Sequence, residues 1–327
     1  MPCIFCRSTQ DLTEEHLFPA FCGGVLTVHD ASCGKCNKDK CNKFENRIAA
    51  GTRPMRNVLE IEDRYGDVPD SQVTFAFGGL VVPAKRTGDG DILLTDYVAK
   101  ALSEDGKTIK RGLFRSPETA EKFSEKARKR GERVNDVPVA RDLTIEPISE
   151  QSIEFAFTPE MKQLVAKIAL VGLAYRYGTE YALGSQFDKL RESIFVPTLP
   201  VHIFANPYFA DNQTRTPMQH SISTYLSAGM HHGWSVITMF GGLSYLVYLT
   251  DSFNERESRS FSIHYDIGMK RECNPIVLMD EYNLIGRIQS DSTKFDSVDD
   301  ADEQWFKIVE PYCKAKGLDI FRSVSRP

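Results

Sequence analysis

The chain has 327 residues, of which 41% are apolar and 10% aromatic. This composition excludes a disordered or fibrous protein and is sufficient for a sizeable buried core. The formal net charge of −5 excludes a general attraction to polyanions, so nucleic-acid binding would need local basic patches. The longest apolar run, 236–249, is too short for a bilayer, and no secretory signal follows Met1. We therefore expect a cytoplasmic protein without membrane contact.

The first part of the chain, residues 1–60, is predicted to be a small module stapled by zinc. Six of the eight cysteines lie within the first 41 residues, a crowding that favours a metal over disulfides in a reducing compartment. Two Cys-x-x-Cys knuckles can together complete a tetrahedral four-thiolate site, which supplies folding energy that so short a segment lacks. The predicted zinc ligands are Cys3, Cys6, Cys33 and Cys36. Cys41 is an alternative for one of them, whereas Cys22 is expected to be a buried small residue.

Between and just after the knuckles lies a recognisable order of residues. Glu15-His16 is followed by Pro19 and by Gly23-Gly24, and Asn37 comes directly after the second knuckle. Over residues 3–47 this order resembles the HNH endonucleases, the ββα-metal nucleases in their zinc-stapled form. The resemblance implies a structural zinc ion and a catalytic Mg²⁺ or Mn²⁺ ion.

The resemblance also implies a role for each matching residue. His16 corresponds to the general base, Glu15 to the acidic metal ligand before it, and Asn37 to the metal ligand on the helix. An imidazole titrates near working pH and can take a proton from water, and a sparse set of oxygen ligands suits hydrated Mg²⁺. Glu14 is an alternative to Glu15, and Asn42 is an alternative to Asn37.

The middle position of the HNH pattern has no clear match in this chain. It should fall shortly before Cys33, where His29 and Asp30 are the candidates, and neither is the asparagine usual in the family. The role that orients the general base therefore has no assigned residue.

Two stretches are basic enough to contact phosphates, 31–57 and 106–133. The first lies on and after the expected catalytic helix, where a DNA duplex would pass. The predicted nucleic-acid contacts are Lys35, Lys38, Lys40, Lys43 and Arg47.

Residues 61–327 are predicted to form a larger mixed α+β domain, so the whole chain is classed as α+β. Three helices are expected after the module: 117–130, which is polar, 161–177, which is central and buried, and 185–193. Thr158-Pro159-Glu160 is the start signal of the second, with threonine as N-cap and proline in the first turn. The expected strands are 73–82 with a glycine break, 92–97, 137–148, 152–157, 201–204, 234–240, 244–249, 261–267 and 276–279. A closing amphipathic helix is expected over 301–316.

The sequence thus favours a metal-dependent endonuclease of double-stranded DNA, with defence against foreign DNA or restriction as roles that fit by analogy. Residues 61–327 would regulate, sense or recruit DNA, and a homo-oligomer is compatible with the sequence. The alternative is a non-catalytic zinc module that docks nucleic acid or protein. The Glu15-His16 pair separates the two hypotheses, because a pure scaffold does not need it.

Overall fold

A computed structural model describes residues 1–63, 65–77, 80–94, 98–102, 109–114, 117–131, 146–147, 156, 158–197, 201–205 and 217–273. The strand predicted over 276–279 and the helix predicted over 301–316 lie outside these residues. So do most of the strands predicted over 137–148 and 152–157.

The N-terminal residues form a ββα unit. Strand β1 (Leu12–His16) pairs antiparallel with β2 (Thr27–Cys33), and a short 3₁₀ turn, η1 (Ala20–Cys22), lies between them. A π-helical segment, η2 (Lys35–Cys41), then leads into α1 (Asn42–Gly51) and α2 (Arg53–Val58).

The Gly23-Gly24 pair shapes the loop between the two strands. Gly23 ends η1 with φ of 79°, which favours glycine. Gly24 approaches the chain so closely that a Cβ there would lie 2.0 Å from the Phe18 carbonyl oxygen. The loop therefore requires glycine at both positions, for two different physical reasons.

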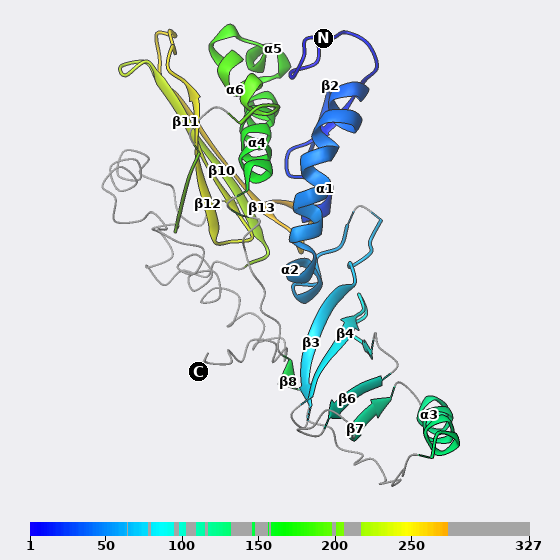
Figure 1. Ribbon diagram of the computed structural model, residues 1–327. Coiled ribbons are helices and arrows are strands. Elements are labelled where there is room, and N and C mark those ends of the chain that lie inside the picture. The colour runs from blue at the N-terminus through cyan, green and yellow to red at the C-terminus, as the bar shows by residue number, and fades with distance from the viewer. Residues whose placement is uncertain are drawn as a thin grey trace.

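A long helix, α4 (Pro159–Tyr177), lies at the centre of the molecule, between α1 and a large sheet (Figure 1). Thr158 caps it by accepting a hydrogen bond from the Met161 amide, so the predicted helix start is confirmed. Every residue from Leu164 to Ala174 is buried, which also confirms the predicted central helix. Helices α5 (Thr179–Ala182) and α6 (Asp188–Ser193) follow, with a 3₁₀ turn, η4 (Ser185–Phe187), between them.

The large sheet has six strands in the order β14-β13-β10-β11-β12-β9, and all neighbours are antiparallel. Its strands are β9 (Val201–Ala205), β10 (Gln219–Ser227), β11 (His232–Met239), β12 (Leu243–Thr250), β13 (Arg259–Asp266) and β14 (Arg271–Cys273). Strands β9, β11, β12 and β13 confirm the strands predicted there. Strand β10 was not predicted. It lies inside the sheet, and its Ile222 packs against Gly172 of α4.

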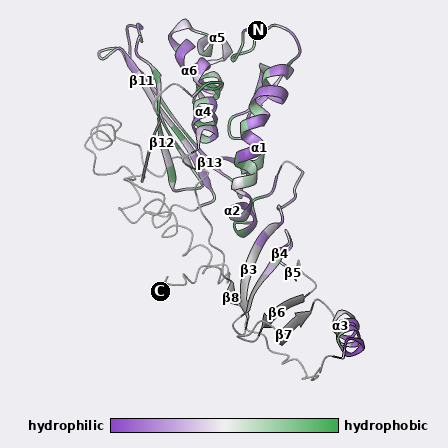
Figure 2. Ribbon diagram, in the orientation of Figure 1, coloured by the Kyte–Doolittle hydropathy of each residue, from purple (hydrophilic) through white to green (hydrophobic). Residues whose placement is uncertain are grey.

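A smaller group of elements follows α2 in the chain. It contains a four-stranded sheet of order β5-β4-β3-β8 and a two-stranded sheet, β6-β7. The strands are β3 (Ser71–Phe77), β4 (Leu80–Arg86), β5 (Ile92–Leu94), β6 (Val98–Leu102), β7 (Ile109–Phe114) and β8 (Glu146–Pro147). Helix α3 (Pro117–Lys129) confirms the predicted polar helix and is mostly hydrophilic in Figure 2.

The single strand predicted over 73–82 is wrong. Residues 71–86 form two antiparallel strands, β3 and β4. Their pairing runs from Ser71 with Arg86 to Phe77 with Leu80. This antiparallel pairing identifies two strands and not one strand with a bulge.

The fold class is confirmed as α+β, with a four-cysteine cluster at the N-terminus followed by a larger mixed part. One buried cluster of apolar residues contains members from Cys3 to Ile61 and from Ala156 to Ile267. The N-terminal unit thus shares its core with α4 and the large sheet. The domain boundary near residue 60 stays a prediction. Among the helices of the described residues, none is both long and apolar enough for a membrane crossing.

Candidate active site and zinc centre

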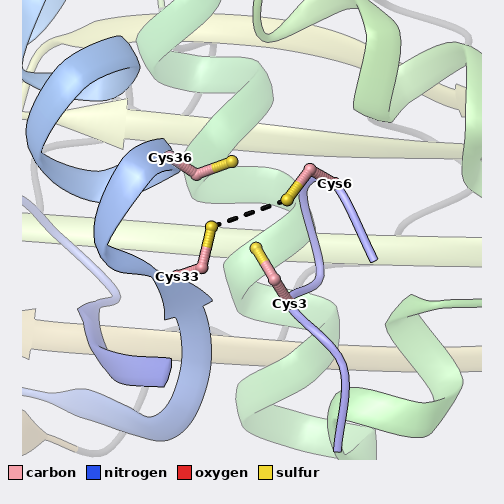
Figure 3. A group of neighbouring side chains, drawn as sticks. All are labelled: Cys3, Cys6, Cys33 and Cys36. Atoms are coloured by element: carbon pink, nitrogen blue, oxygen red, sulfur yellow. Dashed lines mark hydrogen bonds between the residues drawn. The ribbon is translucent and has the colours of Figure 1, made fainter. Parts of the chain in front are cut away.

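The four cysteines of the two knuckles converge on one point (Figure 3). Their sulfur atoms all lie within 4.8 Å of one another, and the Cys6 and Cys33 sulfurs are 3.5 Å apart. Zinc–sulfur bonds of about 2.3 Å in a tetrahedron place the sulfurs roughly 3.8 Å apart, so the four residues fit a zinc ion. Cys41 is buried but is not part of this group, and Cys22 is buried as predicted.

The local backbone prepares the first knuckle for a metal. The Arg7 amide donates to the Cys3 carbonyl at 2.8 Å, and Arg7 adopts a left-handed φ of 62°. A hydrogen bond from the Cys36 thiol, together with nearby backbone N–H groups, lowers the pKa of Cys3 to about 5. The Ile4 amide donates to the Ala31 carbonyl at 2.8 Å and so joins this knuckle to β2. A thiolate is the form that binds zinc, so these contacts favour metal binding.

His16 is the last residue of β1 and lies opposite Thr27 of β2. Its side chain is partly exposed, whereas the next two residues, Leu17 and Phe18, are fully buried. The imidazole therefore stands at the border between the core and the solvent, at the end of a strand that these two buried residues anchor.

A β-bulge shapes the hairpin just before His16. Thr13 pairs with Ser32 and Glu15 pairs with Val28, so Glu14 alone lies opposite residues 29–31. Asn37 reaches this bulge from η2: its amide nitrogen donates to the Thr13 hydroxyl at 3.3 Å and to the Glu14 carbonyl at 3.2 Å. The predicted ligand on the helix is thus fixed to the strand that ends in His16. π-Helical turns such as η2 are frequent at functional sites.

The two neighbouring glutamates of β1 have opposite environments. Glu14 is exposed, and its carboxylate lies 2.7 Å from Nδ1 of the exposed His29. Asp30 is also exposed and has a left-handed φ of 53°. His29 and Asp30 therefore both lie on the bulge, and the assignment of the middle HNH position to either of them stays a prediction.

Glu15 points into the protein, where only 2% of its side chain is exposed. Its Oε1 lies 2.6 Å from Nζ of Lys167 on α4, and the same ammonium contacts Glu45 on α1. Oε2 of Glu15 is buried without a hydrogen bond among the described residues, and the Ser32 hydroxyl lies near enough to the carboxylate to lower its pKa. An oxygen left over in this way is compatible with a role as a cation ligand, which stays a prediction.

Burial and charge act in opposite directions on this cluster. Burial raises the pKa of Glu15, and the nearby Lys167 ammonium opposes that change. Burial alone would lower the pKa of Lys167, but the carboxylates of Glu15 and Glu45 outweigh it and raise the pKa. Lys167 is therefore a buried cation.

The contacts of Lys167 and Glu45 were missed at the sequence level. The available signal was a lone charged residue, Lys167, within the otherwise apolar stretch from Leu164 to Ala174. A buried lysine needs a partner, but the sequence does not show that the partners are on β1 and α1.

The five predicted nucleic-acid contacts are all on η2 and α1, the segment that packs beside the hairpin. Two of them also contact the second part of the chain: Lys40 lies 4.4 Å from the centre of the Phe195 ring, and Arg47 pairs with Glu160. The others, Lys35, Lys38 and Lys43, add positive charge to the same segment.

The hairpin, the helical segment after it and the four-thiolate group define a small zinc-type ββα module. Residues 3–50 match the family model described as HNH endonuclease, which confirms the resemblance at the N-terminus. This part of the chain is thus an HNH domain, a domain of nuclease type. No curated protein and no solved structure matches the chain.

Proposed function

We propose that the protein is a metal-dependent endonuclease that hydrolyses phosphodiester bonds of double-stranded DNA. The main support is the family match over residues 3–50, which coincides with a ββα unit that has His16 at the end of β1. A role in defence against foreign DNA, in the cytoplasm, is the finer hypothesis. It requires residues 61–327 to decide where or when cutting occurs.

In this proposal His16 is the general base. Its imidazole takes the proton of the attacking water, a step that needs a neutral ring and partial access to solvent. Glu15 and Asn37 would hold the Mg²⁺ or Mn²⁺ ion. When bound, the ion supplies charge neutralisation at the scissile phosphate. The bonds from the Asn37 amide to β1 hold its side chain beside the strand that positions His16.

The basic side chains on η2 and α1 would contact the DNA backbone. Such contacts position a duplex without reading its sequence, and their strength falls with salt. The residues proposed for this role are Lys35, Lys38, Lys40, Lys43 and Arg47.

Plasmid cleavage by a His16→Ala variant tests the proposal. Zinc-loaded protein is incubated with Mg²⁺ or Mn²⁺, and we expect the cleavage rate to fall by about 10²–10⁴-fold, as for loss of a general base. His232→Ala is the matched control, because His232 is also partly buried but lies on the large sheet. Equal rates for wild type and His16→Ala would remove His16 from the mechanism.

The second candidate is a zinc module that docks nucleic acid or protein without cutting. The observation in its favour is that Glu15, the expected acidic ligand, is buried against Lys167. This candidate predicts that zinc-loaded wild type binds duplex DNA but leaves it intact with Mg²⁺, Mn²⁺ and other divalent cations. Cleavage that depends on His16 would exclude it.

A further inference from the structure

We propose that Lys167 is a positioning residue for the active site: from outside the HNH domain it fixes the carboxylate of Glu15, the residue that precedes His16 in β1. This inference rests on the proposed function. It assigns part of the nuclease machinery to α4, more than a hundred residues after the matched segment.

The geometry places one ammonium at the junction of three elements. Lys167 belongs to α4, Glu15 to β1 and Glu45 to α1, and the Lys167 side chain is only 3% exposed. The contact fixes the hairpin and the helix of the ββα unit relative to each other. It also fixes both relative to the central helix of the second part of the chain.

The contact also selects between the two carboxylate oxygens. Oε1 of Glu15 bonds the ammonium at 2.6 Å, while Oε2 has no hydrogen-bond partner among the described residues. With Oε1 held, the orientation of the buried Oε2 is set, and in the proposed function this is the oxygen left for the cation. A freely rotating carboxylate would have to be ordered each time the ion bound.

Stability alone does not explain a buried group of this kind. Well-packed apolar side chains of similar volume are often as stable as a buried ion pair, because removing charges from water is costly. The surrounding residues of α4, from Leu164 to Ala174, are otherwise apolar or small, so the lysine is the exception in this stretch. A role in orienting Glu15 explains why an ammonium lies here.

The test uses a charge-matched double variant, Lys167→Met/Glu45→Gln. It removes one positive and one negative charge, so the three-residue group keeps its formal charge of −1 while the ammonium is lost. Glu45→Gln alone is the control, because it leaves the contact between Lys167 and Glu15 in place. Three quantities are measured on zinc-loaded protein: kcat and KM for duplex cleavage, Mn²⁺ affinity by electron paramagnetic resonance, and the thermal midpoint.

We expect the double variant to lose about 10–100-fold in kcat and in Mn²⁺ affinity relative to Glu45→Gln, as for other residues that orient a metal ligand. KM for DNA should stay within about twofold, because the lysines proposed to contact DNA lie on η2 and α1. In a Glu15→Gln background the same two substitutions should have no further effect, since Lys167 acts through Glu15. A role in folding alone would lower the thermal midpoint and leave kcat of the folded protein unchanged.

The outcomes separate this inference from the proposed function. A folded double variant with the kcat and Mn²⁺ affinity of Glu45→Gln would overturn the inference and leave the nuclease proposal standing. A wild type that does not cleave, but binds Mn²⁺ in a Lys167-dependent way, would overturn the nuclease proposal alone. A wild type that neither cleaves nor binds Mn²⁺ would overturn both.

If the double variant does not fold, the kcat of the Lys167→Arg variant tests the inference instead. Arginine keeps the charge but moves the donor atoms, so we expect a lower kcat at unchanged KM. An unchanged kcat in this variant would overturn the inference, because exact placement of the cation would then be unnecessary.

Discussion

The two ends of the ββα unit are held in different ways. At the knuckle end, four cysteine side chains within the unit converge on one point and fit a zinc ion. At the other end, the loop 19–24 is held by the large sheet: His220 bonds the Cys22 carbonyl at 3.1 Å, and the Tyr265 hydroxyl donates to the Gly23 carbonyl at 2.6 Å. The HNH domain thus has a group that fits zinc at one end and hydrogen bonds from the rest of the chain at the other.

At the loop end, the His220 ring lies within a cluster of aromatic side chains. The His220 ring lies 4.9 Å from the Phe18 ring and 5.0 Å from the Phe240 ring, measured between centres. Its Nδ1 accepts a hydrogen bond from the Phe240 amide at 3.1 Å, so Nε2 is the nitrogen that donates to the Cys22 carbonyl. The ring is therefore neutral in the folded protein.

The largest expected effect comes from the knuckle end. Removing zinc with a chelator, or replacing Cys36 by Ser, should abolish cooperative folding of residues 1–60, because structural zinc contributes on the order of 10 kcal/mol in small modules. Limited proteolysis and thermal unfolding measure this loss. Cys273→Ser is the control, since Cys273 lies on β14, outside the four-cysteine group. Full zinc content and an unchanged thermal midpoint in Cys36→Ser would contradict the assignment.

A smaller effect is expected at the loop end, as a dependence of stability on pH. Burial lowers the pKa of His220 from 6.5 to about 4. Between about pH 6.5 and about pH 4, His220 is therefore protonated in the unfolded chain but not in the folded protein. The free energy of unfolding consequently falls as the pH falls through this window. The expected loss over this window is roughly 3 kcal/mol.

Urea unfolding between pH 7.5 and 4.5 measures this dependence. A His220→Gln variant should lose most of the corresponding slope, whereas the exposed His231→Ala variant should keep it. The same slope in wild type and His220→Gln would show that other groups cause the acid sensitivity.

The smallest effect concerns a single hydrogen bond. Tyr265→Phe removes the donor to the Gly23 carbonyl and should lower the free energy of unfolding by about 1 kcal/mol. Tyr225→Phe, on β10 and partly exposed, is the matched control. If both variants unfold at the same denaturant concentration as the wild type, the sheet does not hold the loop through this bond.

Local signals in the sequence were sufficient for much of the fold and part of the site. The two knuckles predicted the four-cysteine group, because Cys-x-x-Cys places both thiolates on one side of a turn. Thr158 and Pro159 predicted the start of α4, since capping depends on adjacent residues. Both signals need only a few neighbouring positions.

The missed features depend on contacts distant in the chain or on ambiguous local signals. Strand β10 alternates Ile222, Thr224 and Leu226 with polar residues, and its serines hid the pattern. The pairing of Lys167 with Glu15 joins residues 152 positions apart, and no local signal shows which elements will pack together. The glycine pair after Phe77 fits both a bulge and a reversal, and only the pairing of β3 with β4 decides between them.

The β-bulge has a further consequence for the hairpin, because it determines which of two adjacent acids meets water. Side chains alternate between the faces of a strand, so a register slip of one residue exchanges the faces. Deleting one residue from the segment 29–31 would invite such a slip, with Glu14 turning toward Lys167 and Glu15 toward solvent. The length of this short segment, and not only the identity of its side chains, is therefore under constraint in any chain that keeps the same chemistry.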